Sequence, residues 1–285
     1  MLRRYADILR HQARPGRFLV SRALLYSGLS TRFVIPKRGF RLRFYPTNGS
    51  AQQWVDPYHE HDSDHGRREE TFFRGYLRPD DVVVDVGASI GLTALTAFSV
   101  VGRGGRVLAF EPHPRIFGFL VGNIALNGAE AVITPRNVAL GESSGTVFIT
   151  DARADDANSV SSEATGVSVP ISTLDEVAAQ LPRIALLKID VEGYELFVLR
   201  GAVDTLKRID CIYFESYDPN FARHGYGLSE LVELMAANGF EVRRFDGAGT
   251  TTAVIAAEGS SDLEDLVAVR NLDHLHRRLA EAGVS

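Results

Sequence analysis

The 285-residue chain contains a single cysteine, Cys211, so it can form neither an internal disulfide nor a cysteine-cluster metal site. It also lacks an apolar run long enough for a membrane-spanning helix, and its N-terminus has no uninterrupted apolar segment typical of secretory signals. Hydrophobic and charged contents of 45% and 24% are those of a globular protein. We therefore expect a cytoplasmic globular protein whose cysteine lies in the core.

Acidic residues are nearly absent from residues 1–45, which contain eleven bases and one acid, Asp7. Because the overall charge is -5, the rest of the chain carries about -15. An acidic body suits a cationic ligand and argues against a nucleic-acid substrate. The basic segment up to about Ser27 predicts one or two amphipathic helices. These could make peripheral contact with an anionic membrane, but we favour packing on the chain's own acidic domain or on a second copy in a homodimer.

Two phosphate-binding fingerprints are missing from residues 82–91, which read V-V-V-D-V-G-A-S-I-G. A G-x-G-x-x-G pattern started at Gly87 fails, because serine and leucine hold the second and third glycine positions, and no G-K-[ST] is present. The residues instead predict a buried β-branched strand that ends at Asp85, a glycine turn to Gly91, and a helix after it. An acid without a lysine indicates a cationic or zwitterionic ligand, with an ordinary βα turn as the alternative.

A second acid follows the next predicted strand, residues 106–110, where Glu111 precedes Pro112. In doubly wound folds an acid at this strand end accepts the ribose hydroxyls of a nucleoside. The carboxyl ends of neighbouring parallel strands lie at one edge of the sheet. Asp85 and Glu111 are therefore expected to form one constellation.

Four segments resemble the FkbM-type S-adenosylmethionine-dependent methyltransferases: D-V-G-A-S-I-G (85–91), F-E-P (110–112), N-V-A-L-G (137–141) and K-I-D-V-E-G-Y-E (188–195). The last is the most specific, and the resemblance covers roughly residues 69–257. It implies an α/β, Rossmann-like class I methyltransferase fold with a seven-stranded, mostly parallel sheet and an N-terminal helical and hairpin extension. Residues 240–245 and 252–257 are expected to form an antiparallel pair at the sheet edge.

The resemblance also implies S-adenosylmethionine as the cofactor. The strand end and glycine turn would hold its methionine part, Glu111 its ribose and residues 137–138 its adenine. No metal is required, because the sulfonium already supplies a good leaving group. The expected cofactor-binding residues are Asp85, Gly87, Ala88, Ser89, Gly91, Glu111, Pro112, Asn137, Val138 and Asp190.

A hydroxyl acceptor must lose its proton, so a general base is expected near the strand ends. Asp190 ends the fourth predicted core strand and is the favoured candidate, although it could instead bind the cofactor's amino group. Lys188 is expected to orient a neighbouring carboxylate. A histidine has the better intrinsic pKa for a base, but a lone loop histidine is usually only solvated. The candidate catalytic residues are Asp190, Glu192, Glu215 and His224.

These observations predict O-methylation of a small molecule, a sugar or a secondary metabolite. A nitrogen or carboxylate acceptor is one alternative, and a non-catalytic S-adenosylmethionine-binding or membrane-surface protein is another. Three regions are expected: an N-terminal extension (1–66), a methyltransferase domain (67–260) and a C-terminal helical tail (261–285), in which residues 263–282 look helical.

The N-terminal extension is expected to cap the open end of the sheet and to wall the acceptor pocket. Residues 32–35 and 40–45 predict a β-hairpin, because the second arm alternates apolar and basic residues. Residues 54–65 then read as a polar loop in which Trp54 and Tyr58 could supply apolar walls. Its histidines fit no standard metal-ligand spacing, so we favour a pocket-lining role over a metal site.

Overall fold

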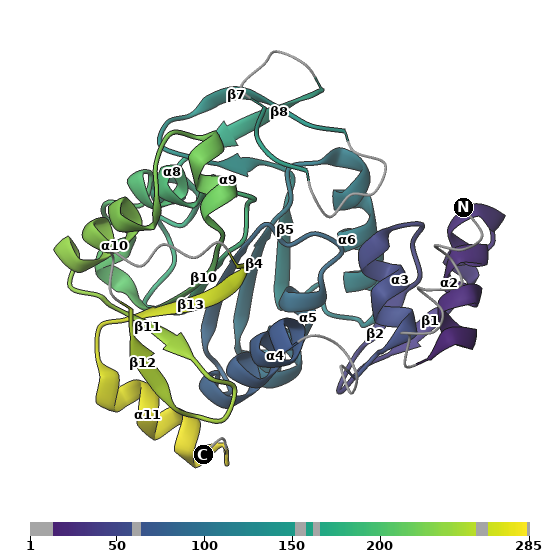
Figure 1. Cartoon of the computed structure of the whole chain (residues 1–285), viewed down its shortest axis with the longest axis horizontal. Helices are drawn as coiled ribbons and strands as arrows, with labels where there is room; N and C mark the ends of the chain where they lie inside the picture. Colours follow the sequence, from purple (N-terminus) through teal and green to yellow (C-terminus); the bar gives the residue numbers. More distant parts are fainter. Residues whose placement is uncertain (1–13, 59–63, 152–157, 162–165, 255–261, 284–285) are drawn as a thin grey trace.

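The computed structural model describes residues 14–58, 64–151, 158–161, 166–254 and 262–283, with the side chains of 64–66 left aside. Its centre is one eight-stranded sheet (Figure 1). The strands are β3 (Val82–Val86), β4 (Arg106–Phe110), β5 (Ile133–Arg136), β9 (Ile184–Ile189), β10 (Ile209–Ser216), β11 (Glu241–Phe245), β12 (Thr251–Ala253) and β13 (Glu264–Val269). Their order across the sheet is β12-β11-β13-β10-β9-β3-β4-β5.

The parallel half of the sheet consists of β10, β9, β3, β4 and β5. β3 lies between β9 and β4, and Val83 and Val84 are fully buried. A short β-branched run suits this position, because both faces of a central parallel strand are covered. The expected central place of this strand is confirmed, and Cys211 lies buried in β10.

Helices cover both faces of the sheet and complete a three-layer α/β structure. One apolar core contains Val83 and Val107 and is covered by four helices: α4 (Asp64–Tyr76), α5 (Leu92–Val101), α6 (Pro114–Leu126) and α11 (Leu272–Glu281). The opposite core contains Val84 and Leu108 and is covered by α7 (Leu174–Val177), α8 (Glu195–Arg200) and α10 (Leu228–Ala237). Alternate residues of each strand thus face different helical layers. The expected Rossmann-like fold class is confirmed.

The antiparallel part differs from the expectation. β13 lies inside the sheet, antiparallel to both β10 and β11, and it comes from residues predicted to be helical. Leu266 to Val269 form a continuous buried apolar run, which suits a strand covered on both faces. The sheet therefore has eight strands rather than seven, and a C-terminal strand belongs to its interior. The edge pair is confirmed as β11 and β12.

A smaller three-stranded sheet lies beside the carboxyl end of the main one (Figure 1). Its order is β6-β8-β7, from β6 (Ala139–Leu140), β7 (Gly145–Ile149) and β8 (Val167–Ser172). A short helix, α9 (Asp218–Arg223), follows β10. Its first turn contains a proline, which is tolerated there because the missing N–H has no helical partner.

The N-terminal segment contains α2 (Pro15–Ser27), β1 (Val34–Pro36), β2 (Arg41–Arg43) and α3 (Asn48–Val55). β1 and β2 form the expected hairpin. Its second strand packs beside α6, where the side-chain oxygens of Asn127 and Asn123 accept the backbone N–H of Arg41 and Arg43 at 2.8 and 2.7 Å. The buried hairpin side chains join the core beneath α5 and α6, so the hairpin is part of the main fold.

Candidate active site

A cavity of about 470 Å³ lies at the carboxyl ends of β3, β4, β9 and β10. This is the edge where open α/β sheets bind ligands. The small sheet contributes part of the wall, and Gln52 contributes from α3. The residues that line it include Gly87, Ser89, Glu111, Asp190, Glu192 and Glu215.

The glycine turn after β3 is built for close packing. Gly87 has a φ of +81°, and a Cβ there would lie 1.8 Å from the backbone oxygen of Asp190. Gly91 has a φ of +94°, and its Cβ would lie 2.8 Å from a methyl carbon of Leu120. Only glycine fits these contacts with a left-handed backbone. The turn is thus pressed against the end of β9, and Ser89 lines the cavity.

Glu111 is buried at the end of β4 and lines the cavity. Its two carboxylate oxygens accept the backbone N–H groups of Ser89 and His113, each at 2.9 Å. Burial raises its pKa to about 7, and the two N–H groups oppose that shift. Each carboxylate oxygen has a second lone pair, so the fixed side chain can still accept hydrogen bonds from the hydroxyl groups of a ligand.

The wall beside Glu111 does not include the predicted amide of Asn137. Asn137 donates from its side chain to the backbone oxygens of Glu111 and Pro112, both at 2.8 Å, and does not line the cavity. The next residue, Val138, does line it. Asn137 therefore fixes the chain at this strand end, and Val138 presents an apolar surface on which a flat ring could lie.

Lys188 links the ends of β3 and β9. Its ammonium lies 3.1 Å from an oxygen of Asp190 and 3.6 Å from one of Asp85, and it donates to the backbone oxygen of Gly87 at 3.2 Å. Burial alone would lower its pKa, but the carboxylates of Asp190, Asp85 and Glu69 outweigh burial and raise it. Lys188 therefore stays charged and orients Asp190, as expected from the sequence.

Asp85 is wholly buried behind this lysine and does not line the cavity. Neither of its oxygens has a hydrogen-bond partner among the described residues. Burial raises its pKa, and the nearby lysine opposes the shift. Its place supports the turn and Lys188 from behind, whereas the sequence predicted direct contact with the cofactor.

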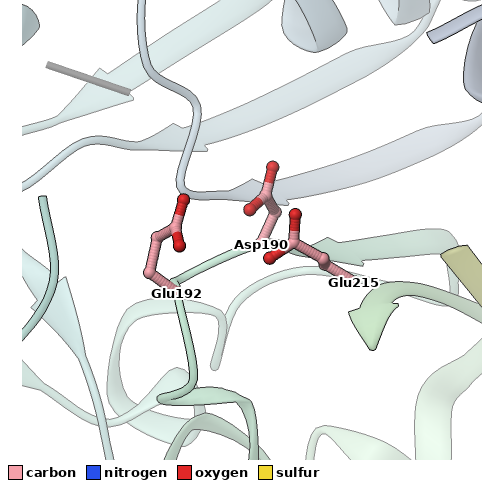
Figure 2. Close-up of side chains that lie close together, drawn as sticks. All are labelled: Asp190, Glu192 and Glu215. Carbon is pink, nitrogen blue, oxygen red and sulfur yellow. The ribbon is translucent and has the colours of Figure 1, made fainter. Parts of the chain in front are cut away.

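Asp190, Glu192 and Glu215 all line the cavity, and Figure 2 shows their carboxylates close to one another. Each offers an oxygen atom, and these atoms lie within 4.8 Å of one another, so the group could hold a metal ion or share protons. Burial, together with the neighbouring acids, raises the pKa of Glu215 to about 10. Glu215 is therefore protonated at neutral pH in the free protein.

The turn that presents Glu192 is held from below by Glu195, which the sequence did not single out. One oxygen of Glu195 accepts the backbone N–H groups of Val191 and Gly193 at 3.1 and 3.2 Å. Tyr226 donates to the backbone oxygen of Gly193 at 2.9 Å. Glu192 itself has a φ of +56°, so its backbone needs such support. Glu195 is the last residue of the K-I-D-V-E-G-Y-E segment, and its place in that segment is the sequence signal that could have identified it.

With this geometry established, comparison with known families gives one decisive match. The model of the "Methyltransferase FkbM domain" family matches residues 85–242, more than half of the chain. The chain belongs to the FkbM methyltransferase family. The matched range begins at Asp85 in β3 and ends in β11, so it contains the glycine turn, Glu111 and the three convergent carboxylates.

Two curated proteins and many solved structures resemble this FkbM protein. Hexuronic acid methyltransferase AglP of Haloferax volcanii is 32% identical over 142 residues, which cover 48% of this chain and 56% of AglP. Methyltransferase sdnD of Sordaria araneosa is 26% identical over 72% of this chain and 88% of sdnD. A precorrin-6y C5,15-methyltransferase structure from Geobacter metallireducens has a TM-score of 0.42 and 15% identity, covering 72% of this chain and 87% of that one.

The FkbM domain brings only some of the predicted site residues to its cavity. Those that line it are Gly87, Ser89, Glu111, Pro112, Val138, Asp190, Glu192 and Glu215. Ala88 and Gly91 are buried in the turn, so they shape it from within. His224 instead packs against the rings of Tyr194 and Phe197, with centroids 5.4 and 6.1 Å away, and burial lowers its pKa.

The N-terminal extension contributes less to the FkbM cavity than the sequence predicted. Gln52 is its one lining residue in the described chain. Trp54 lies in the last turn of α3. Its ring packs edge-on against those of Phe33 and Phe44, and the ring centroids are 6.0 Å apart in both pairs. Tyr58 does not line the cavity either. Residues 59–63, which include two of the loop's histidines, lie outside the described residues.

Proposed function

We propose that this protein transfers the methyl group of S-adenosylmethionine to a hydroxyl of a small molecule, a sugar or a secondary metabolite. The observation that carries the proposal is Glu111, a buried carboxylate fixed beside the glycine turn and open to the cavity. A nucleoside's ribose hydroxyls are suitable donors to it. The tight turn at Gly87 and the apolar Val138 surface fit the remaining parts of such a cofactor.

S-adenosylmethionine supplies a methyl group on a sulfonium, which leaves as a neutral thioether after in-line displacement. The protein must then align the acceptor and remove its proton. Asp190 is our candidate base, because the ammonium of Lys188, 3.1 Å away, holds its side chain in the cavity wall. We assign Glu192 to orienting the acceptor hydroxyl. Glu215 is protonated at neutral pH before ligands bind, so it is the weaker candidate.

The charge of the cavity supports a neutral or amino-bearing acceptor over an anionic one. Its described lining contains four carboxylic acids and no lysine or arginine. An acceptor carboxylate placed there would meet other carboxyl groups, with no lysine or arginine of the described lining to pair with it, and would pay for its desolvation. AglP is named for a hexuronic acid, so the acceptor of this chain would differ from that protein's in charge.

The proposal is tested in two steps with the purified full-length protein. Calorimetry should detect binding of S-adenosylhomocysteine, and wild type should transfer a labelled methyl group to neutral hexosides or amino sugars more rapidly than to uronic acids. Mild alkali then separates the products, since methyl esters are hydrolysed and methyl ethers survive. Failure to bind S-adenosylhomocysteine would overturn the cofactor assignment. Alkali-labile products would show that a carboxylate, rather than a hydroxyl, is methylated.

The candidate base is tested by Asp190→Asn and Glu192→Gln, with Glu215→Gln as the matched comparison. We expect Asp190→Asn to reduce kcat by roughly a hundredfold or more, the usual contribution of general base catalysis. S-adenosylhomocysteine affinity should change far less. An Asp190→Asn enzyme with nearly normal kcat would exclude Asp190 as the base.

A further inference from the structure

Large apolar side chains that face solvent are concentrated in the N-terminal segment. Nine are exposed among the described residues, and six of these fall within residues 19–34. Tyr26 is 77% exposed and Leu19 is 51% exposed. Single exposed apolar side chains are normal, but such a concentration indicates a binding surface. We call these six residues the apolar N-terminal group: Leu19, Val20, Tyr26, Leu29, Phe33 and Val34.

Helix α2 is apolar on both of its faces. Phe18 and Leu24 are buried, whereas Leu19, Ala23 and Tyr26 are exposed and follow one another at helical spacing on the other face. α2 packs against α3 and is the outermost helix on the right of Figure 1. Its exposed stripe therefore points away from the body and can meet a flat surface without a clash from the rest of the described molecule.

The charged residues of this part of the sequence are all basic. Residues 14–45 contain eight arginines and lysines and no acid. Arg17, Arg22 and Arg32 are exposed, and none of them pairs with a carboxylate in the described part of the chain. In a two-fold dimer the same patch meets itself, so these arginines would be brought toward their own copies. An anionic surface is the better complement.

We propose that α2 and the turn after it bind the surface of a bilayer that contains anionic lipids. The apolar N-terminal group would enter the headgroup region, and the arginines would pair with lipid phosphates. No described helix has the length and apolar composition to cross a membrane, and the proposal concerns contact with one leaflet only. It does not depend on the methyl-transfer proposal, because the candidate active site lies at the carboxyl edge of the sheet and no residue of α2 lines it.

The test is co-sedimentation of the full-length protein with vesicles of two compositions. One contains phosphatidylcholine alone, and the other also contains phosphatidylserine as about one third of its lipid. We expect the partition coefficient to be at least about tenfold higher for the anionic vesicles, since each basic residue near such a surface adds to binding. Raising the ionic strength from about 0.1 M to about 1 M should remove most of this preference.

Paired variants locate the contact. Leu19→Ser with Tyr26→Ser should reduce vesicle binding about tenfold or more, whereas Val203→Ser, at a side chain that is 59% exposed elsewhere, should leave it unchanged. Arg22→Gln with Arg32→Gln should lower the preference for anionic vesicles, with the exposed Arg103→Gln as its control. Circular dichroism checks that each variant is folded.

Three results would overturn the proposal. The first is equal sedimentation with both vesicle types, and the second is unchanged binding by the Leu19 and Tyr26 double variant. The third is a dimer, seen by light scattering, that the same double variant converts to monomers without any vesicle binding by wild type. That result would identify the apolar N-terminal group as an interface between two copies of this chain.

Discussion

Glu111 is the residue whose chemistry bears most directly on ligand binding. Replacing it with alanine should weaken S-adenosylhomocysteine binding by about 1.5–3 kcal/mol, the scale for lost charged hydrogen bonds. Because the pKa of Glu111 is raised to about 7, a growing fraction of its side chains is protonated as the pH falls from 8 to 6. The protonated form accepts fewer hydrogen bonds from ligand hydroxyls. The affinity of the wild-type protein for S-adenosylhomocysteine should therefore decrease as the pH is lowered from 8 to 6.

The control for this pH effect is Glu111→Gln, whose side chain does not titrate. Its affinity should be lower than that of wild type at pH 8 and nearly independent of pH between 6 and 8. Calorimetry at three pH values makes the comparison. A wild-type affinity that is flat across this range, or a Gln variant that keeps the full slope, would contradict the role given to Glu111.

The sequence identified the acids at the strand ends because a strand, a turn and a helix are local patterns. Asp85, Glu111, Asp190 and Glu215 all follow apolar runs, and three of the four line the cavity. The burial of Asp85 depends on Lys188, about a hundred residues away in the chain, so no local pattern could reveal it. Glu195 was missed for a related reason, since its partners include Tyr226.

At the scale of one turn, Glu195 supports the segment that presents Glu192. Glu195→Ala should leave the backbone N–H groups of Val191 and Gly193 without an acceptor, which costs about 1–3 kcal/mol for each buried donor. We expect lower thermal stability and a lower kcat. Glu195→Gln keeps an acceptor oxygen and should rescue most of both.

Tyr226→Phe is the second variant, because it removes the hydroxyl that contacts both the backbone oxygen of Gly193, at 2.9 Å, and the other carboxylate oxygen of Glu195, at 3.2 Å. It should lower kcat more than it lowers S-adenosylhomocysteine affinity, since Glu111 and the glycine turn remain intact. Differential scanning calorimetry and single-turnover kinetics measure the two effects. Normal kcat in Glu195→Ala would show that the turn holds its shape without this carboxylate.

The N-terminal hairpin belongs to the core and is not only a cap. Leu42 is fully buried beneath α6, so Leu42→Ala should destabilise the protein by about 2–5 kcal/mol. Val34, on the neighbouring strand, is 37% exposed, and Val34→Ala should have a much smaller effect. Urea unfolding compares the pair. For the same reason, a chain that begins near residue 67 should fold poorly.

Across the whole molecule, several buried acids make the stability of the ligand-free protein depend on pH. Burial raises the pKa values of Glu69, Glu111 and Glu195 to about 7 from an ordinary 4.5. Between pH 4.5 and about pH 7 the folded state therefore binds more protons than the unfolded state. The stabilising contribution is complete below pH 4.5 and is lost as the pH rises through 7.

We therefore expect a lower free energy of unfolding at pH 8 than at pH 6 for wild type. Glu195→Gln should show a weaker dependence, because one of the buried acids with a raised pKa is gone. Urea unfolding at pH 6, 7 and 8 tests this, with the solvent-exposed Glu281→Gln as the control. Stability that rises steadily from pH 6 to pH 8 would contradict the prediction.

The internal place of β13 has a consequence for the order in which the chain can fold. β10 and β11 leave the ribosome before the strand that lies between them, and both pair with it. Until β13 is made, the β10 edge stays open, and β11 with its partner β12 has no place in the sheet. Assembly of this half must therefore wait for a contact that is distant in sequence, a feature of slow folding and of exposure to mispairing.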